Sequence, residues 1–327
     1  MFRSLAVAAA CALALAGCAP TAIGNVVGAK ASTSGPFGLM RPDDVEVSGA
    51  SAFKGLGRVT VGNFMVGFST YDTPSSRSRA GSSAVRSTLL GIDLAVMQRI
   101  TDEAYAKFVA DLKAQGFTVV DRAELLAFNG YAASKSYPNP YEDSSGGLFG
   151  STSRISYFTP SGFGPTKVYQ GDIIGTLGGF ALDNPLKYAA GYASSTGVTV
   201  LHPVYALGFV NKQGGFRMTS AVVAGQGLTA LPGATKLVAT GNGSGGVVTL
   251  GQPVTSEREF ATVAETTSAG SRAGEAAVNV LAVLGGVGTS SARDFAFNAR
   301  PADYTAAVLE TLTKVNTDFI AKMVSLR

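Results

Sequence analysis

A strand, an amphipathic helix and a second strand follow one another within residues 57–121, and this unit constrains the fold more than any other feature. Residues 57–72, GRVTVGNFMVGFSTYD, carry apolar side chains on both alternating faces, which is typical of a strand covered on both sides. Thr101 is a candidate N-cap for a helix that ends at Gly116. The segment FTVVD, 117–121, then predicts a short strand. Strand–helix–strand units build a sheet with helices packed against it.

The rest of the chain adds strand-like runs and a long helix. KQGG at 212–215 and GNGSGG at 241–246 each separate two such runs, which predicts two hairpins. The apolar run 276–288 is too short to span a bilayer and predicts a buried helix or an interface. Pro301 suits the first turn of a long C-terminal helix. We therefore expect an α+β fold: a mixed sheet with packed helices, an antiparallel β-rich region and a long C-terminal helix.

The start of the chain has the pattern of a secretory signal. The uncharged run from Leu5 to Ala16 is shorter than the roughly 20 residues that a bilayer-spanning helix needs. Residues 15–18, Leu-Ala-Gly-Cys, resemble the lipobox of bacterial lipoproteins. The resemblance implies that Cys18 is acylated and begins the mature chain. Ala19 is not the aspartate that retains such proteins in the inner membrane, which implies the outer membrane. An ordinary secretory signal with a chance cysteine is the alternative.

Composition agrees with an exported, stably folded protein. Cys11 lies within the predicted signal, so the mature chain would hold no disulfide and would depend on a large core. Hydrophobic residues make up 46% of the chain and charged residues only 15%, which together with 41 glycines favours a β-rich envelope protein. The formal charge of +4 is scattered along the chain, so we expect no nucleic-acid partner.

Five segments follow from these patterns. Residues 1–17 are the predicted signal peptide, and 18–44, rich in Gly, Pro and Ser, are expected to form a lipid-anchored flexible tether. The alternative is that part of this segment docks on the folded body. An α/β domain is expected over 45–134 and an aromatic, Gly- and Pro-rich loop over 135–170. Residues 171–327 form the predicted β-rich region with the C-terminal helix, packed with the α/β domain.

The strand–helix–strand unit also resembles two envelope proteins. Residues 55–130 are similar to the α/β domain of the curli-secretion lipoprotein and to the N-terminal domain of the Tol-system β-propeller protein. The shared pattern is a glycine, alternating apolar residues and an arginine, here Gly116, Phe117, Val119, Val120 and Arg122. The long loop at 72–84 departs from those domains. The resemblance implies a way of packing and no chemistry.

The aromatic loop is the candidate binding surface. Aromatic side chains on loops can recognise a partner or a glycan, and here they accompany adjacent carboxylates. The alternative is that these rings pin the loop to the core. The candidate residues are Tyr137, Tyr141, Glu142, Asp143, Tyr157 and Phe158.

No motif identifies a reaction. Gly241, Gly243 and Gly246 have dinucleotide-loop spacing but precede a strand-like run, where a helix would be needed. His202, the one histidine, lies in a predicted strand and is expected to be a packed residue. Glu142 and Asp143 are the only candidates for carboxylate catalysis. We expect no enzyme, no metal and no cofactor.

These observations favour an outer-membrane lipoprotein that acts as a non-enzymatic structural or assembly subunit of the cell envelope, within a secretion or surface-structure complex. Its partners would be the membrane, through the lipid anchor, and envelope proteins or further copies of the chain. A pore would need hairpins with one polar face, whereas 197–224 is apolar on both. The alternative is a periplasmic carbohydrate-binding or hydrolytic module that uses the aromatic loop 131–169.

Overall fold

A single mixed sheet of 16 strands organises the part of the chain that the structure describes. The computed structural model describes residues 20–34, 40–78, 81–143, 153–169, 184–213, 222–241, 243–284 and 289–327. Five α-helices accompany the sheet within these ranges. This confirms the predicted fold class, including the strand–helix–strand unit, the antiparallel region and the long C-terminal helix.

The elements have the following bounds. The strands are β1 Thr21–Val26, β2 Val45–Ser48, β3 Arg58–Val61, β4 Met65–Asp72, β5 Ser75–Ser78, β6 Gly81–Leu90, β7 Thr118–Val119, β8 Tyr141–Asp143, β9 Ser153–Phe158, β10 Thr199–Gln213, β11 Val223–Ala230, β12 Lys236–Thr240, β13 Gly245–Leu250, β14 Val254–Thr255, β15 Ala261–Glu265 and β16 Thr289–Ala299. The helices are α2 Leu94–Ala114, α3 Arg122–Ala127, α4 Pro185–Thr196, α5 Ala269–Leu284 and α6 Pro301–Leu326, with short 3-10 turns η2 Ala50–Phe53 and η3 Ser161–Phe163.

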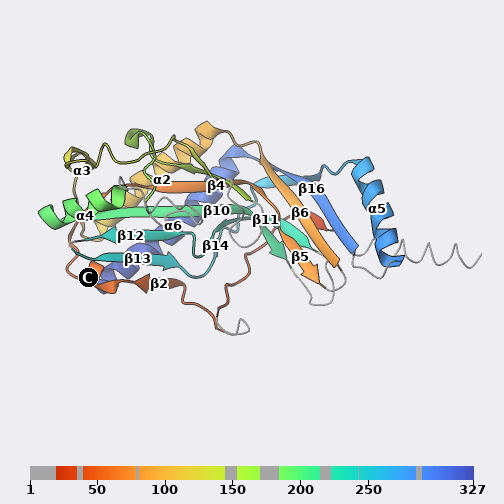
Figure 1. The fold of residues 1–327 in the computed structure, drawn as a ribbon, viewed down its shortest axis with the longest axis horizontal. Helices are drawn as coiled ribbons and strands as arrows, with labels where there is room; N and C mark the ends of the chain where they lie inside the picture. Colours follow the sequence, from red (N-terminus) through yellow and green to blue (C-terminus); the bar gives the residue numbers. More distant parts are fainter. Residues whose placement is uncertain are drawn as a thin grey trace, which may run out of the picture.

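Strand β10 runs through the middle of the sheet (Figure 1). It lies parallel to β3 and β4 and antiparallel to β11 and β12. Leu201 pairs with Val61 and Val204 pairs with Met65, so the β3–β4 side holds one more residue than β10. A β-bulge at 62–64 accommodates it, and the one strand expected over 57–72 is therefore two.

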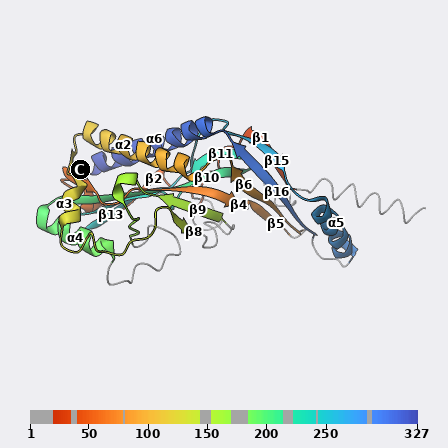
Figure 2. The same cartoon turned by 90° about the horizontal axis from the view of Figure 1, so that it is seen from above.

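Both faces of the central strands are covered, as the apolar residues on both faces predict. Leu201 and Tyr205 face the core beneath α2 and α6, whereas Val200 faces a second cluster with α3 and α4. Figure 2 shows α2 and α6 side by side along one face of the sheet. Helix α6 buries an apolar stripe against the sheet, and each such side chain contributes about 1.5–3 kcal/mol on burial. Its members are Tyr304, Val308, Leu312, Val315, Phe319 and Met323.

Helix α2 begins two turns earlier than the sequence suggests. The Asp93 carboxylate accepts a hydrogen bond from the Val96 backbone N–H at 2.8 Å and caps the helix. Thr101 is buried within the helix, and its hydroxyl donates to the Met97 carbonyl at 2.9 Å, so the predicted start at Thr101 is wrong. The apolar stripe continues toward the N-terminus and is buried, which extends the helix. The predicted end at Gly116, with φ +82°, is confirmed.

The predicted flexible tether is largely docked on the sheet. Strand β1 pairs in parallel with β11, and the Thr21 N–H donates to the Val222 carbonyl at 2.9 Å. Further along, the Ser32 N–H donates to the Gln252 side chain at 2.9 Å. For residues 20–34, flexible coil is therefore wrong and the alternative, a docked segment, describes them.

Glycines in β11 explain why this segment docks. A Cβ at Gly225 would lie 2.3 Å from the Val27 side chain, so the missing side chain leaves the space that Val27 fills. The Asn211 amide also donates to the Val27 carbonyl at 2.8 Å. The glycines of β11 indicate a close approach by another part of the chain. The sequence does not show that this part lies about 200 residues earlier.

An extension of the sheet, called the arm here, consists of β5, β6, β16 and α5 (Figure 1, right). Strand β6 meets β4 only at Tyr71 and Asp72 but pairs in parallel with most of β16. The run predicted at 276–288 lies partly in helix α5. There the Asn279 amide and carbonyl bond the Ser290 backbone at 2.9 and 2.8 Å, which ties α5 to β16. Among the described residues, no helix is both long and apolar enough to cross a bilayer.

Candidate functional site

The two ends of the sheet differ in what they hold. Thr21 and Gln213 both pair with Val223, so β1 starts where β10 ends. Strand β4 runs parallel to β10 and ends at Asp72. The arm extends beyond Asp72, in the direction in which β4 and β10 run. We call this the N-terminal end of the sheet. The chain terminates at the opposite, C-terminal end, where α6 finishes (Figure 1).

A polar hollow of about 470 Å³ lies at the N-terminal end, beside the first described residues. Glu265 contacts two guanidinium groups, Arg272 at 3.0 Å and Arg293 at 3.9 Å, so one carboxylate faces two positive charges. Cys18 lies outside the described residues. It precedes Thr21 by three residues, a span of at most about 11 Å. The hollow is lined by Pro20, Thr21, Ala22, Val263, Glu265, Arg272, Arg293 and Phe295.

The candidate residues of the aromatic loop do not form one surface. Tyr157 and Phe158 are each only 2% exposed because they lie in β9, which pairs with β4 inside the sheet. For these two, the expectation of a binding role is wrong, and the alternative, that the rings pin the segment to the core, describes them. Residues 144–152 of the loop lie outside the described residues.

The other four candidates lie in β8, Tyr141–Asp143, or shortly before it. The Tyr137 and Tyr141 rings meet edge to face with centroids 5.1 Å apart. Burial raises the pKa of the Tyr141 hydroxyl, and the nearby Asp143 carboxylate adds to this effect. The Glu142 carboxylate accepts a hydrogen bond from the Ser156 hydroxyl at 2.9 Å. These four residues remain a candidate surface without a described cavity.

A better-formed concavity, the arginine cleft, lies where η3 meets α2 and α3. It measures about 510 Å³ and is lined by Asp102, Tyr105, Asp121, Arg122, Ala123, Leu126, Pro160, Ser161, Gly162 and Phe163. The Arg122 guanidinium stacks 4.0 Å from the centre of the Phe163 ring, and its Nε donates to the Gly62 carbonyl at 3.1 Å. The Tyr105 ring meets Phe163 edge to face at 5.0 Å.

The cleft combines an aromatic surface with both signs of charge. Within the described residues, Arg122 forms no ion pair, while the Asp102 carboxylate accepts from the Ser161 N–H at 2.7 Å. Burial raises the pKa of the Tyr105 hydroxyl, and Arg122 partly opposes that shift. Sequence reasoning missed this site because its parts come from three separate segments. In the sequence, Arg122 stands out only as part of the pattern shared with the two envelope domains.

Behind the cleft lies a sealed polar cluster. The Lys167 ammonium donates to the Ala132 and Ser134 carbonyls at 3.2 and 2.9 Å, and burial together with Arg122 lowers its pKa to about 8. The Tyr131 and Tyr169 hydroxyls bond each other. This cluster fastens the segment 131–134 to the segment at 167–169, which is a structural role.

His202 is a packed residue, as predicted. It is fully buried, and its ring stacks on Tyr169 with centroids 3.9 Å apart. Neither ring nitrogen has a hydrogen-bond partner among the described residues. Burial lowers the pKa of His202 to about 3, so the ring is neutral at physiological pH. Sealed from solvent, it cannot serve a substrate as a base.

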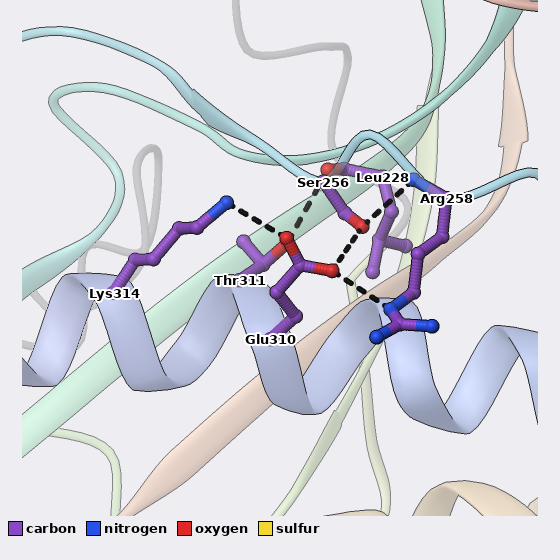
Figure 3. Close-up of polar contacts among 6 residues, drawn as sticks. All are labelled: Leu228, Ser256, Arg258, Glu310, Thr311 and Lys314. Carbon is purple, nitrogen blue, oxygen red and sulfur yellow. Dashed lines mark hydrogen bonds and ion pairs between the residues drawn. The ribbon is translucent and has the colours of Figure 1, made fainter.

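Glu310 on α6 lies at the centre of a cluster of polar contacts (Figure 3). It accepts hydrogen bonds from the Ser256 hydroxyl at 3.0 Å, the Arg258 Nε at 2.9 Å and the Lys314 ammonium at 2.8 Å. The hydrogen bond from Lys314 is the largest cause of its lowered pKa, although desolvation opposes the shift. The Glu310 carboxylate is ionised, and the cationic groups of Arg258 and Lys314 balance its charge. Its hydrogen bonds to Ser256 and Arg258 hold the segment after β14 against α6.

The glycine motif at 241–246 is structural. It joins β12 to β13 as a hairpin, and a strand follows it, as the sequence indicated. A Cβ at Gly246 would lie 2.5 Å from the Phe53 ring, so close packing of η2 requires the glycine. A groove of about 880 Å³ between α4 and this hairpin is lined mainly by small residues. Across the described ranges, no three His, Cys, Asp or Glu side chains gather as metal ligands.

The observed architecture defines a mixed α/β protein built on one bulged sheet. In comparisons with protein-family models, curated proteins and solved structures, no match was found for the chain. The resemblance of residues 55–130 to the curli-secretion and Tol-system domains therefore remains a prediction.

Proposed function

We propose that this chain is an outer-membrane lipoprotein, acylated at Cys18, that acts as a non-enzymatic structural or assembly subunit of the cell envelope. The observation that carries the proposal is the short distance along the chain between the lipobox and the sheet. Residues 15–18 have the lipobox pattern, and the Thr21 N–H is already bonded to Val222 at 2.9 Å. An acyl group on Cys18 would hold the folded body itself, with no long tether between them.

The physics of such an anchor is favourable. Each buried CH₂ contributes about 0.8 kcal/mol, and more than one acyl chain gives stable attachment without a spanning helix. With a reach of at most about 11 Å, the N-terminal end of the sheet would rest at the lipid surface. The C-terminal end, with the arginine cleft and the α4 groove, would point away from the lipid, where envelope partners can bind.

A structural role is supported by the state of the titratable groups. Glu310 accepts three hydrogen bonds, two of them from the charged groups of Arg258 and Lys314, and His202 is buried against Tyr169. The Lys167 ammonium donates to the Ala132 carbonyl and to Ser134. These groups stabilise the fold and leave little chemistry for catalysis.

Metabolic labelling with palmitate, followed by membrane fractionation, tests the proposal. The wild-type chain should carry label and sediment with the outer membrane, and Cys18→Ser should lose both properties. Cys11→Ser is the matched control and should behave as wild type. A wild-type chain without label, or a Cys18→Ser variant that fractionates unchanged, would contradict the proposal.

The arginine cleft favours carbohydrate binding as a second candidate function. A stacked guanidinium–aromatic pair beside carboxylates offers a sugar both a flat apolar surface and hydrogen-bond partners. Calorimetric titration with peptidoglycan fragments tests it: Phe163→Ala should abolish binding and Tyr141→Ala should not. Loss of binding in Tyr141→Ala alone would move the site to the loop, and no binding by wild type would exclude this function.

A further inference from the structure

The polar hollow beside β1 has a charge imbalance that nothing in the fold uses. Arg272 and Arg293 share the single carboxylate of Glu265, which leaves one net positive charge. The guanidinium-bearing side chains are 47% and 18% exposed, so both can be reached from the hollow. No other hydrogen-bond acceptor for these two groups occurs among the described residues. Each guanidinium has five N–H donors and therefore retains several for a ligand.

The hollow also lies where a membrane-anchored chain would meet its lipid. Pro20 lines it, and Cys18 precedes Pro20 by two residues, a span of about 7 Å. The acyl chains of a lipoprotein enter the hydrocarbon, so the modified cysteine lies at the level of the lipid headgroups. Residues this close to it face the phosphates of neighbouring lipids.

From these two observations we propose that the hollow binds the phosphate of an anionic phospholipid headgroup, next to the acyl anchor. Arginine suits this ligand because its planar fork forms paired hydrogen bonds with phosphate oxygens. Phe295 and Val263 provide an apolar wall for the start of the lipid chains. The bound headgroup would add a second attachment point, so that the sheet has one fixed orientation on the membrane. The inference rests on the proposed function.

Native mass spectrometry of the purified, acylated protein in neutral detergent tests the site, with phosphatidylglycerol as the added lipid. Arg272→Gln/Arg293→Gln should bind it at least tenfold more weakly, since each basic residue near an anionic surface contributes roughly fivefold. Lys113→Gln/Lys322→Gln removes the same charge at the C-terminal end and should match wild type. Glu265→Gln frees both arginines and should bind the lipid several-fold more tightly.

The outcomes separate this inference from the proposed function. The same spectrum reports the acyl mass on Cys18, so its absence contradicts the anchor, whereas an acylated chain with unchanged lipid binding in the double arginine variant overturns the hollow. Inorganic phosphate should compete weakly. If millimolar phosphate displaces the lipid completely, the hollow is a phosphate site and the lipid proposal fails. If the double variant misfolds by circular dichroism, Glu265→Gln decides: unchanged binding overturns the proposal.

Discussion

The body of the sheet and the arm are held together by different forces. In the body, β10 lies between two apolar layers. The Phe64 ring contacts three other rings there, those of Tyr105, Phe108 and Tyr205. In the arm, the first residues of β6 and β16, 81–84 and 289–292, are small or polar and are joined by backbone pairing, and Arg86 forms an ion pair with Asp294. The later apolar residues of these strands, among them Val85 and Phe297, join the main core instead. The body is therefore stable through burial of apolar side chains. The arm depends more on polar contacts and, under the proposed function, on the membrane.

The largest effect is expected from a cavity in the body. Phe64→Ala removes the ring at the centre of the aromatic cluster and should lower the free energy of unfolding by about 3–5 kcal/mol. Denaturant-induced unfolding measures the change. Leu94→Ala, at a side chain 57% exposed, is the control and should stay within about 0.5 kcal/mol of wild type. Equal losses in both variants would show that the aromatic cluster is not the core.

Acid should destabilise the body through His202. Its pKa is about 3 in the folded state and about 6.5 when unfolded, so between these values the unfolded chain binds a proton that the folded chain does not. Stability is retained above pH 6.5 and falls by about 1.4 kcal/mol per pH unit below it, or about 2 kcal/mol at pH 5. His202→Phe should flatten the pH profile of unfolding in this range. An equally steep profile in that variant would assign the loss to other groups.

Release of residues 20–34 from the sheet should lower stability less than the core cavity does. It should, however, make this segment accessible to proteases. In Gly225→Val, the new side chain would occupy the space of Val27 and expel residues 20–34, lowering stability by about 1–3 kcal/mol. Limited proteolysis should then cut this segment. Gly24→Ala, with open space around its Cβ, is the control and should resist. A segment that is cut equally in wild type would be a tether after all.

The smallest effect is expected in the arm. Asp294→Asn removes the partner of Arg86, and because both side chains are about 40% exposed, the loss should be under about 1 kcal/mol. Amide hydrogen exchange should speed up in β6 and β16 and stay unchanged in β10. Faster exchange throughout β10 would mean that the arm and the body unfold as one unit.

The fold was predictable from local signals where residues close in sequence pack together. The apolar stripe of α6, the Gly116 helix end and the hairpin of β12 and β13 each depend on spacing within one segment. Strands β10 and β11 are antiparallel neighbours as expected, but Lys212 and Gln213 of the predicted KQGG loop belong to β10. The start of α2 was missed because Thr101 is a good N-cap by type, whereas the apolar stripe continued to Val96.

The sites were less predictable because they join distant segments. The docking of β1 depends on Gly225, and the polar hollow combines residues about 270 positions apart, such as Pro20 and Arg293. Burial of Tyr157 and Phe158 follows from the pairing of β9 with β4, which composition cannot reveal. A Gly- and Pro-rich segment can be coil or an edge of a sheet, and only its partner decides.

The central claim is that a docked N-terminal strand holds one end of the sheet on the membrane. Single nitroxide labels at Ala264→Cys and Ser325→Cys, on the acylated protein in vesicles, test it by relaxation from a headgroup-bound paramagnetic lipid. Cys18 would carry the acyl chains, so each variant offers one reactive thiol. We predict strong relaxation at position 264 and little at 325. Equal relaxation at both positions would contradict the claim, because a freely tethered body shows the membrane no preferred end.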